Sequence, residues 1–256
     1  MFICIAGKNK CSIDALKILI RNRINKKNIL VLTNASDDGY DNWQPSLKKY
    51  SRKNKFRIIS INDLYEIKDL IFFSLEYEKI INIEKFKSKK LFNFHFSLLP
   101  KYRGCHTNFL QIYNSEKYSG VTLHKINKGI DTGNIIDQKK FKIKLNHTAY
   151  DNYLRLMNYS VILFKKNLHK ILKSNYRERK QILSKGKYYK RSSVNYKKIL
   201  KIEVKNQSIK LHNKIRSLIF PPYQMPIVNG IKVKKSIYKN NKIYLIESSN
   251  NKFKNS

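Results

Sequence analysis

Residues 91–104, with the sequence LFNFHFSLLPKYRG, carry the most information about the fold. Their first half alternates apolar residues with Asn93 and His95, so the two polar side chains share one face of a strand. The proline that follows ends the strand in a turn. Ligands bind beyond the carboxyl ends of strands in open α/β sheets, so these polar groups predict a ligand site. The later segment GIDTG, residues 129–133, offers Asp131 as a carboxylate that closes on the imidazole.

Apolar runs separated by helical or polar segments extend from this stretch toward both ends of the chain. We expect strands at 2–6, 29–33, 57–61, 70–74, 91–96, 120–126 and 135–143. Residues 148–173 have the longest helical periodicity. Strands that alternate with helices predict an α/β domain with a mainly parallel sheet.

The amino-terminal elements have local signals of their own. Gly7 ends the first strand, and Ser12 is expected to cap the helix that follows. The apolar stripe predicted for this helix consists of Ala15, Leu16, Leu19 and Ile20.

Three regions follow one another along the chain. We expect the α/β domain at 1–175, a Lys- and Tyr-rich linker region at 176–207, and a small helix and β-hairpin region at 208–256. In the last region, Pro221 and Pro222 end a helix expected at 208–220. Strand-like alternation on both sides of Asn240 and Asn241 predicts a hairpin turn.

The composition excludes several classes of protein. With 41% hydrophobic and 12% aromatic residues, the chain of 256 residues is too apolar to be disordered. Since no apolar run approaches the roughly 20 residues of a bilayer helix, we expect no membrane span. Cys4, Cys11 and Cys105 show no zinc-ligand or CxxC spacing, which favours a reducing compartment. The apolar start precedes its charges, the reverse of a secretory signal, so a cytoplasmic location is predicted.

The formal net charge of +37 has two interpretations. The excess is mostly lysine in a chain rich in Ile, Asn and Tyr, as an AT-rich genome produces, so the favoured reading is a solvated surface with no nucleic-acid partner. The alternative is an evolved nucleic-acid footprint. In either case the charge attracts anionic ligands.

The motif N-x-H-x-S-L-L-P-x-Y-R-G, followed by G-V-T-L-H at 120–124 and G-I-D-T-G at 129–133, resembles the 10-formyltetrahydrofolate-dependent formyltransferases. The resemblance covers about residues 3–141 and implies a Rossmann-like formyltransferase domain. It also implies an enzyme that moves a formyl group from 10-formyltetrahydrofolate to an amine, with Asn93, His95 and Asp131 as catalytic residues. Those residue types suit the reaction. His95 handles the proton, the Asn93 amide donates to the developing oxyanion, and Asp131 orients the imidazole.

Two further segments resemble the sugar N-formyltransferases that act on dTDP-linked amino sugars. They are NASDDGYDNWQPSL at 34–47 and RSLIFPPYQ at 216–224. The implied acceptor is dTDP-4-amino-4,6-dideoxyglucose or its 3-amino isomer, for surface polysaccharide such as the O-antigen of lipopolysaccharide. The resemblance also implies a homodimer formed through the carboxyl-terminal hairpin region. Two alternatives remain: a methionyl-tRNA formyltransferase, whose larger carboxyl-terminal barrel we do not expect here, and a non-catalytic basic nucleic-acid-binding protein.

The resemblance also implies which residues bind the two substrates. For the folate they are Ser74, Tyr77, Lys79, Asn127 and Lys128. For the nucleotide sugar they are Gly7, Lys8 and Asn9 in a phosphate-binding turn, Trp43 and Gln44 in the polar loop, and Tyr223 after the prolines. From the residues alone, Trp43 could instead anchor the core and Tyr223 could pack at the helix end. No metal is expected, because the histidines lack ligand spacing.

Overall fold

The computed structural model describes residues 1–248, which fold into two compact units that interleave along the chain. The first unit contains residues 1–104, 120–140 and 155–188, and the described part of the second contains 105–119, 141–154 and 189–248. The division into regions at 1–175, 176–207 and 208–256 stays a prediction. Within the described residues, the helices are too short or too polar to cross a bilayer.

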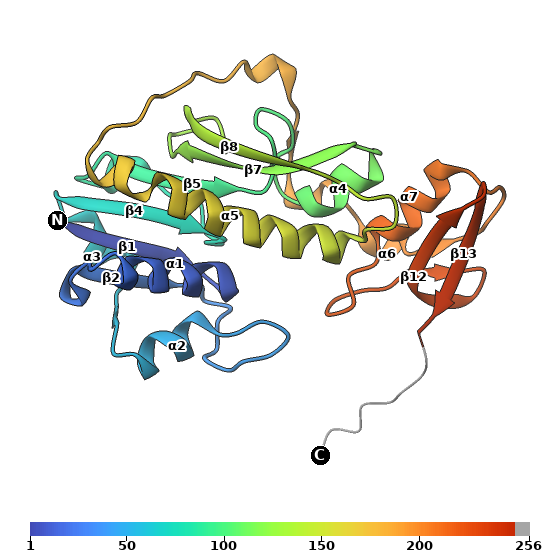
Figure 1. Cartoon of the computed structure of the whole chain (residues 1–256), viewed down its shortest axis with the longest axis horizontal. Coiled ribbons are helices and arrows are strands. Elements are labelled where there is room, and N and C mark those ends of the chain that lie inside the picture. Colours follow the sequence, from blue (N-terminus) through green and yellow to red (C-terminus); the bar gives the residue numbers. More distant parts are fainter. Residues whose placement is uncertain (249–256) are drawn as a thin grey trace. The chain divides into compact units, whose positions relative to one another are not determined.

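The first unit is built on a seven-stranded sheet with the order β3-β2-β1-β4-β5-β7-β8 (Figure 1). Its strands are β1 (Phe2–Gly7), β2 (Ile29–Thr33), β3 (Arg57–Ile58), β4 (Leu70–Leu75), β5 (Lys90–His95), β7 (Tyr118–Lys125) and β8 (Ile135–Lys142). The five strands from β3 to β5 run parallel, and β7 is antiparallel to β5. The predicted mainly parallel sheet is therefore confirmed.

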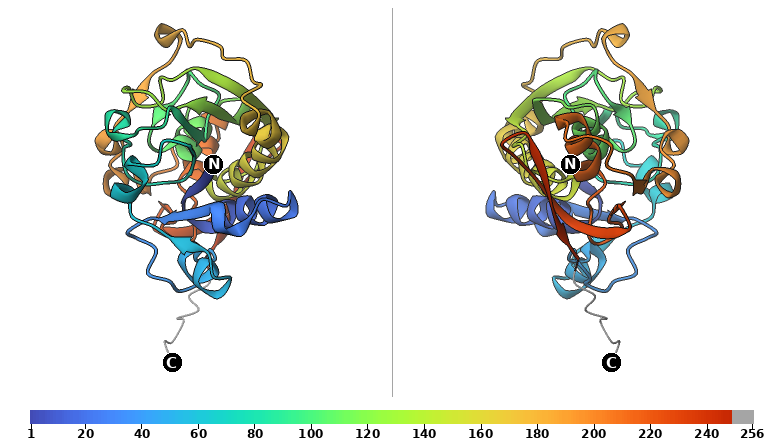
Figure 2. Two further views of the ribbon diagram at one scale, coloured as in Figure 1. Left: turned by 90° about the vertical axis from the view of Figure 1, so that its left-hand side faces the viewer. Right: turned by 90° about the vertical axis from the view of Figure 1, so that its right-hand side faces the viewer.

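Both faces of this sheet are covered because successive β4 side chains point to opposite faces and are apolar and buried on each. The helices of the unit are α1 (Asn9–Arg21), α2 (Leu47–Lys53), α3 (Ile61–Tyr65) and most of α5 (Ala149–Leu172). Phe73 packs with its ring centroid 5.1 Å from that of Phe164 on α5, whereas Phe72 lies 5.7 Å from Phe86 on the other face. Figure 2 shows α1 and α5 together on one side of the strands.

Gly7 ends β1 at a place where only glycine fits. Its φ is +153°, and a Cβ atom there would lie 1.8 Å from the carbonyl oxygen of Leu75. The missing side chain allows the carboxyl ends of β1 and β4 to approach closely, at the point where the strand order reverses.

The first helix differs from its prediction. It begins at Asn9 with Lys8 as N-cap, and Ser12 lies buried inside it. The Ser12 hydroxyl donates to the carbonyl of Leu75 at 3.0 Å, so the prediction that Ser12 caps the helix is wrong. Ile20 is 43% exposed and does not belong to the buried stripe.

The second unit combines short helices with a small sheet. Its helices are α4 (Thr107–Tyr113), α6 (Tyr196–Ile199) and α7 (Ile209–Ser217). The sheet has the order β10 (Lys201–Ile202), β11 (Ile227–Val228), β12 (Ile231–Lys239) and β13 (Lys242–Glu247). Asn240 and Asn241 have φ values of 49° and 55° between β12 and β13, which confirms the predicted hairpin turn. A separate two-stranded sheet pairs β6 (Arg103–Gly104), which belongs to the first unit, with β9 (Tyr188–Tyr189).

Buried polar side chains of α7 hold the second unit together. Arg216 is 4% exposed, donates to Asn213 Oδ1 at 2.8 Å and also to the His147 carbonyl, and burial lowers its pKa to about 10. The His212 ring contacts the Leu145 carbonyl at 2.9 Å and the Ser236 hydroxyl at 2.8 Å. Through these bonds α7 holds both residues 141–154 and the β12–β13 hairpin.

Candidate active site

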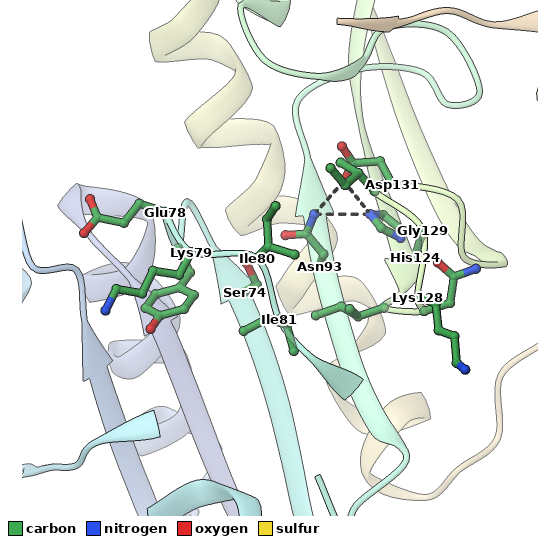
Figure 3. A pocket seen from close by; sticks show the side chains of 14 residues that line it. Ser74, Glu78, Lys79, Ile80, Ile81, Asn93, His124, Lys128, Gly129 and Asp131 are labelled. Atoms are coloured by element: carbon green, nitrogen blue, oxygen red, sulfur yellow. Dashed lines mark hydrogen bonds and ion pairs between the residues drawn. The ribbon is translucent and has the colours of Figure 1, made fainter. Parts of the chain in front are cut away.

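A pocket of about 170 Å³ lies beyond the carboxyl ends of β4 and β5 (Figure 3). Two chain segments, 77–81 and 126–131, form its opposite sides, and Ser74, Asn93 and His124 complete the lining. The five residues predicted to bind the folate, Ser74, Tyr77, Lys79, Asn127 and Lys128, all line this pocket. Four isoleucines add an apolar surface that suits a flat ring: Ile80, Ile81, Ile126 and Ile130.

The predicted catalytic side chains converge beside this pocket. The Asn93 Nδ2 atom donates to Asp131 Oδ1 at 3.3 Å, and His95 Nδ1 lies 3.4 Å from Asp131 Oδ2. Asn93 and Asp131 line the pocket directly, as Figure 3 shows. His95 is 7% exposed and reaches the pocket wall through its contact with Asp131.

The Asp131 carboxylate is surrounded by hydrogen-bond donors. The Gly104 amide donates to Oδ2 at 2.8 Å, and the Gln181 side chain holds the Asp131 carbonyl at 3.0 Å. Burial alone would raise the pKa of Asp131. The neighbouring His95 and His124 imidazoles and the hydrogen bond from the Gly104 amide instead hold that pKa well below its usual range. Asp131 is therefore an ionised carboxylate at neutral pH.

The surroundings of His95 define the direction of its ring. Its Nε2 atom lies 2.7 Å from the Tyr102 carbonyl oxygen, which only accepts hydrogen bonds, so Nε2 carries a hydrogen. The other nitrogen, Nδ1, then faces the Asp131 carboxylate. A proton taken up at Nδ1 is stabilised there by the opposite charge.

His124 belongs to this cluster, although the sequence analysis assigned it no role. The strand register pairs it with Asn93, and its Nε2 atom lies 3.2 Å from Asn93 Nδ2 and 3.5 Å from Asp131 Oδ1. Its Nδ1 atom lies 2.7 Å from the Lys125 carbonyl and carries a hydrogen, so Nε2 accepts from Asn93. The available signal was a histidine near the end of an otherwise apolar strand, in the motif GVTLH.

The residues predicted to bind the nucleotide sugar lie in three places. Gly7 ends β1, Lys8 is the N-cap of α1, and Asn9 begins that helix, where its side-chain amide donates to Glu76 Oε2 at 3.2 Å. In the 34–46 loop, Trp43 is half-buried and Gln44 is 7% exposed, so both are more enclosed than a polar loop predicts.

Tyr223 belongs to the second unit. It is 70% exposed, and its ring stacks on Phe220 with centroids 5.4 Å apart.

Together, the fold and the site define an α/β transferase with an Asn-His-Asp cluster at the carboxyl edge of its sheet. Residues 2–167 match the formyl transferase family, and the chain belongs to that family. The predicted family and Rossmann-like fold are confirmed. The predictions of a formyltransferase and of a formyl-tetrahydrofolate donor are confirmed at the level of the family.

Two solved structures are similar over nearly the whole chain. WlaRD, a sugar 3N-formyl transferase studied with dTDP and 5-N-formyl-THF, is 45% identical with a TM-score of 0.89, over 94% of this chain and 87% of its own. The N-formyltransferase from Helicobacter canadensis, in complex with folinic acid and dTDP-3-aminofucose, is 45% identical with a TM-score of 0.88, over 93% of this chain and 88% of its own.

Among curated proteins, the bifunctional polymyxin resistance protein ArnA of Wigglesworthia glossinidia brevipalpis is 37% identical over 164 residues. That match covers 59% of this chain but only 25% of ArnA.

Proposed function

We propose that this chain is a sugar N-formyltransferase, which moves the formyl group of 10-formyltetrahydrofolate to the amine of a dTDP-linked 3-amino-3,6-dideoxyhexose. The observation that carries the reaction is the convergence of Asn93, His124 and Asp131 on one wall of the pocket. The ligands named for the two similar structures support the acceptor class. They favour the 3-amino sugar over the 4-amino isomer that the sequence analysis put first.

In this proposal Asn93 acts on the formyl oxygen and Asp131 acts with His95 on the proton, and the folate supplies an activated formyl group when bound. Asn93 donates a hydrogen bond to the formyl oxygen as charge develops on it. Its present contacts of 3.2 and 3.3 Å are longer than the usual distance of about 2.9–3.0 Å, so its amide can redirect one hydrogen at little cost.

The proton lost by the amine needs an acceptor near the pocket. Asp131 is ionised, lines the pocket and faces His95 Nδ1, so the carboxylate and the imidazole together receive that proton. As the new C–N bond forms and the bond to the folate nitrogen breaks, the folate nitrogen takes up a proton in turn. The positive charge that His95 gains with this proton is balanced by the Asp131 carboxylate.

The binding residues keep their predicted tasks in this proposal. Ser74, Tyr77, Lys79, Asn127 and Lys128 contact the folate, while Gly7, Lys8, Asn9, Trp43, Gln44 and Tyr223 contact the nucleotide sugar. We further propose that the enzyme is a homodimer and acts in the cytoplasm. Its formylated sugar product would be used for surface polysaccharide.

The test is tetrahydrofolate release by the purified protein, given 10-formyltetrahydrofolate and one acceptor at a time. The acceptors are a dTDP-linked 3-amino-3,6-dideoxyhexose, its 4-amino isomer and methionyl-tRNA. Release with the 3-amino sugar alone is expected. Release with the 4-amino sugar alone would revise the ring position, and release with methionyl-tRNA alone would refute the sugar acceptor.

A further inference from the structure

The segment 76–78, directly after β4, contacts three of the regions to which the proposed function assigns a ligand. Its residues Tyr77 and Glu78 line the proposed folate pocket. The Glu76 carboxylate accepts from Asn9, in the turn proposed to bind the pyrophosphate. Glu78 accepts from the start of the 34–46 loop, which contains Trp43 and Gln44. One short segment thus touches both proposed ligand sites.

The contact with the loop is made by the Glu78 carboxylate. Its Oε1 atom accepts from the Ala35 amide at 2.8 Å, and its Oε2 atom accepts from the Ser36 hydroxyl at 2.7 Å. Burial would raise the pKa of Glu78, but the bonds from Ser36 and Ala35 hold it below its usual value. The carboxylate is therefore charged at neutral pH and holds the first turn of the loop.

Asn34 reinforces this contact from the end of β2. Its side chain is 2% exposed, donates to the Glu76 carbonyl at 2.9 Å and accepts from the Glu78 amide at 3.2 Å. Two kinds of hydrogen bond therefore join the segment 76–78 to the start of the loop. Those of Asn34 are partly buried, and those of the Glu78 carboxylate are exposed.

A second carboxylate, that of Asp37, joins the first turn of the loop to its last residue and to α2. Asp37 accepts from the Ser46 hydroxyl at 2.5 Å and from the Lys48 amide at 2.9 Å, at the start of α2. Most residues of the loop are exposed, so hydrogen bonds rather than packing set its position.

We propose that Glu78 is a positioning residue that couples the two ligand sites, so that each ligand binds more tightly when the other is present. This inference rests on the proposed function. A folate that contacts residues 77–81 restricts the motion of those residues. Because Glu78 is hydrogen-bonded to Ala35 and Ser36, the 34–46 loop is restricted as well. The loop then loses less conformational freedom when the nucleotide sugar binds. Figure 3 shows Glu78 and Lys79 on the segment that lines the pocket.

The experiment measures the affinity of the full chain for dTDP by calorimetry, with and without saturating 5-formyltetrahydrofolate. In the wild-type protein we expect dTDP to bind about fivefold or more tightly when the folate is present. In Glu78→Ala the ratio should fall to about one, and in Glu78→Gln, which keeps one acceptor, it should be intermediate. Glu66→Ala is the matched control, because Glu66 is an exposed glutamate that pairs with Lys87 outside the pocket lining.

Hydrogen exchange gives a readout that does not depend on activity. Adding 5-formyltetrahydrofolate alone should slow amide exchange in peptides covering residues 35–46 of the wild-type protein, but not of Glu78→Ala. If Glu78→Ala does not fold, Ser36→Ala is the substitute variant. It removes the exposed hydrogen bond from the Ser36 hydroxyl to Glu78 and should reduce the coupling between the two ligands.

The possible failures separate the two proposals. If both ligands bind to the wild-type protein independently, or if the coupling survives in Glu78→Ala, the inference is overturned and the proposed function stands. If neither ligand binds to the wild-type protein, the proposed function itself is refuted.

Discussion

Replacing Asp131 with asparagine tests the proposed reaction while leaving the shape of the site nearly unchanged. An asparagine can place its oxygen at the Gly104 amide, which now donates to Oδ2 at 2.8 Å, and its NH₂ group at the Oδ1 position toward His124 Nε2, although Asn93 Nδ2 then loses the acceptor that it has there at 3.3 Å. The bond to Gly104 then loses its charge assistance, so we expect unfolding to require about 1–2 kcal/mol less free energy.

The effect on turnover should be much larger. His95 Nδ1 lies 3.4 Å from Asp131 Oδ2. At that separation, and with an effective dielectric constant of about 20, two unit charges attract by about 5 kcal/mol. If the transition state uses half to all of that attraction, Asp131→Asn lowers kcat by roughly 70- to 5,000-fold. The assay is tetrahydrofolate release under saturating substrates, beside urea denaturation of the same preparation.

Asp137→Asn is the matched control for this prediction. Asp137 is also a carboxylate with a lowered pKa, and it accepts hydrogen bonds from Asn167 and Lys166 instead of facing the pocket. The Asp137→Asn variant should lose about as much unfolding free energy as Asp131→Asn, but its kcat should stay at the wild-type value. Turnover of Asp131→Asn within about threefold of wild type would refute the role assigned to the carboxylate.

Three further changes test separate parts of the structure. Asn93→Ala should lower kcat by about 100- to 1,000-fold with little change in folding, as measured by turnover and thermal denaturation; unchanged kcat would contradict its role at the formyl oxygen. Gly7→Ala brings a Cβ atom to 1.8 Å from the Leu75 carbonyl and should destabilise the fold by about 3 kcal/mol, whereas Gly39→Ala, whose nearest such contact is 3.6 Å, should cost less in urea denaturation. Burial lowers the pKa of His212, so the folded protein favours the neutral ring; its stability contribution is present above about pH 6.5 and is lost as pH falls below that value. His212→Gln should therefore flatten the decline in unfolding free energy between about pH 7 and 5, and an unaltered slope would contradict this assignment.

The parallel strands were predictable because their residues are apolar on both faces. Phe72 and Phe73 point to opposite sides of the sheet, yet both are fully buried, so β4 reads as a continuous apolar run. The start of α1 was not predictable in the same way. Ser12 has the residue type of a cap, but a tertiary bond to Leu75 uses its hydroxyl, and no local pattern encodes that partner.

The site was predictable in part for a similar reason. Asn93 and His95 alternate along one strand, so their shared direction follows from the sequence. The place of His124 depends instead on the antiparallel register of β5 and β7, which pairs it with Asn93 across a long sequence separation. The enclosure of Gln44 likewise depends on how Asp37 and Asp41 fold the loop back through their bonds to Ser46.

The interleaving of the two units constrains how this chain can be divided and how it can fold. Residues 105–119 and 141–154 are synthesised early but belong to the unit completed by α7 and the hairpin. Phe109 and Leu110 on α4 are buried there, and Ser115 accepts from Asn213 on α7. A chain cut after residue 188 would expose these apolar groups. Because the second unit is assembled from three separate stretches of the chain, it cannot be removed by a single truncation.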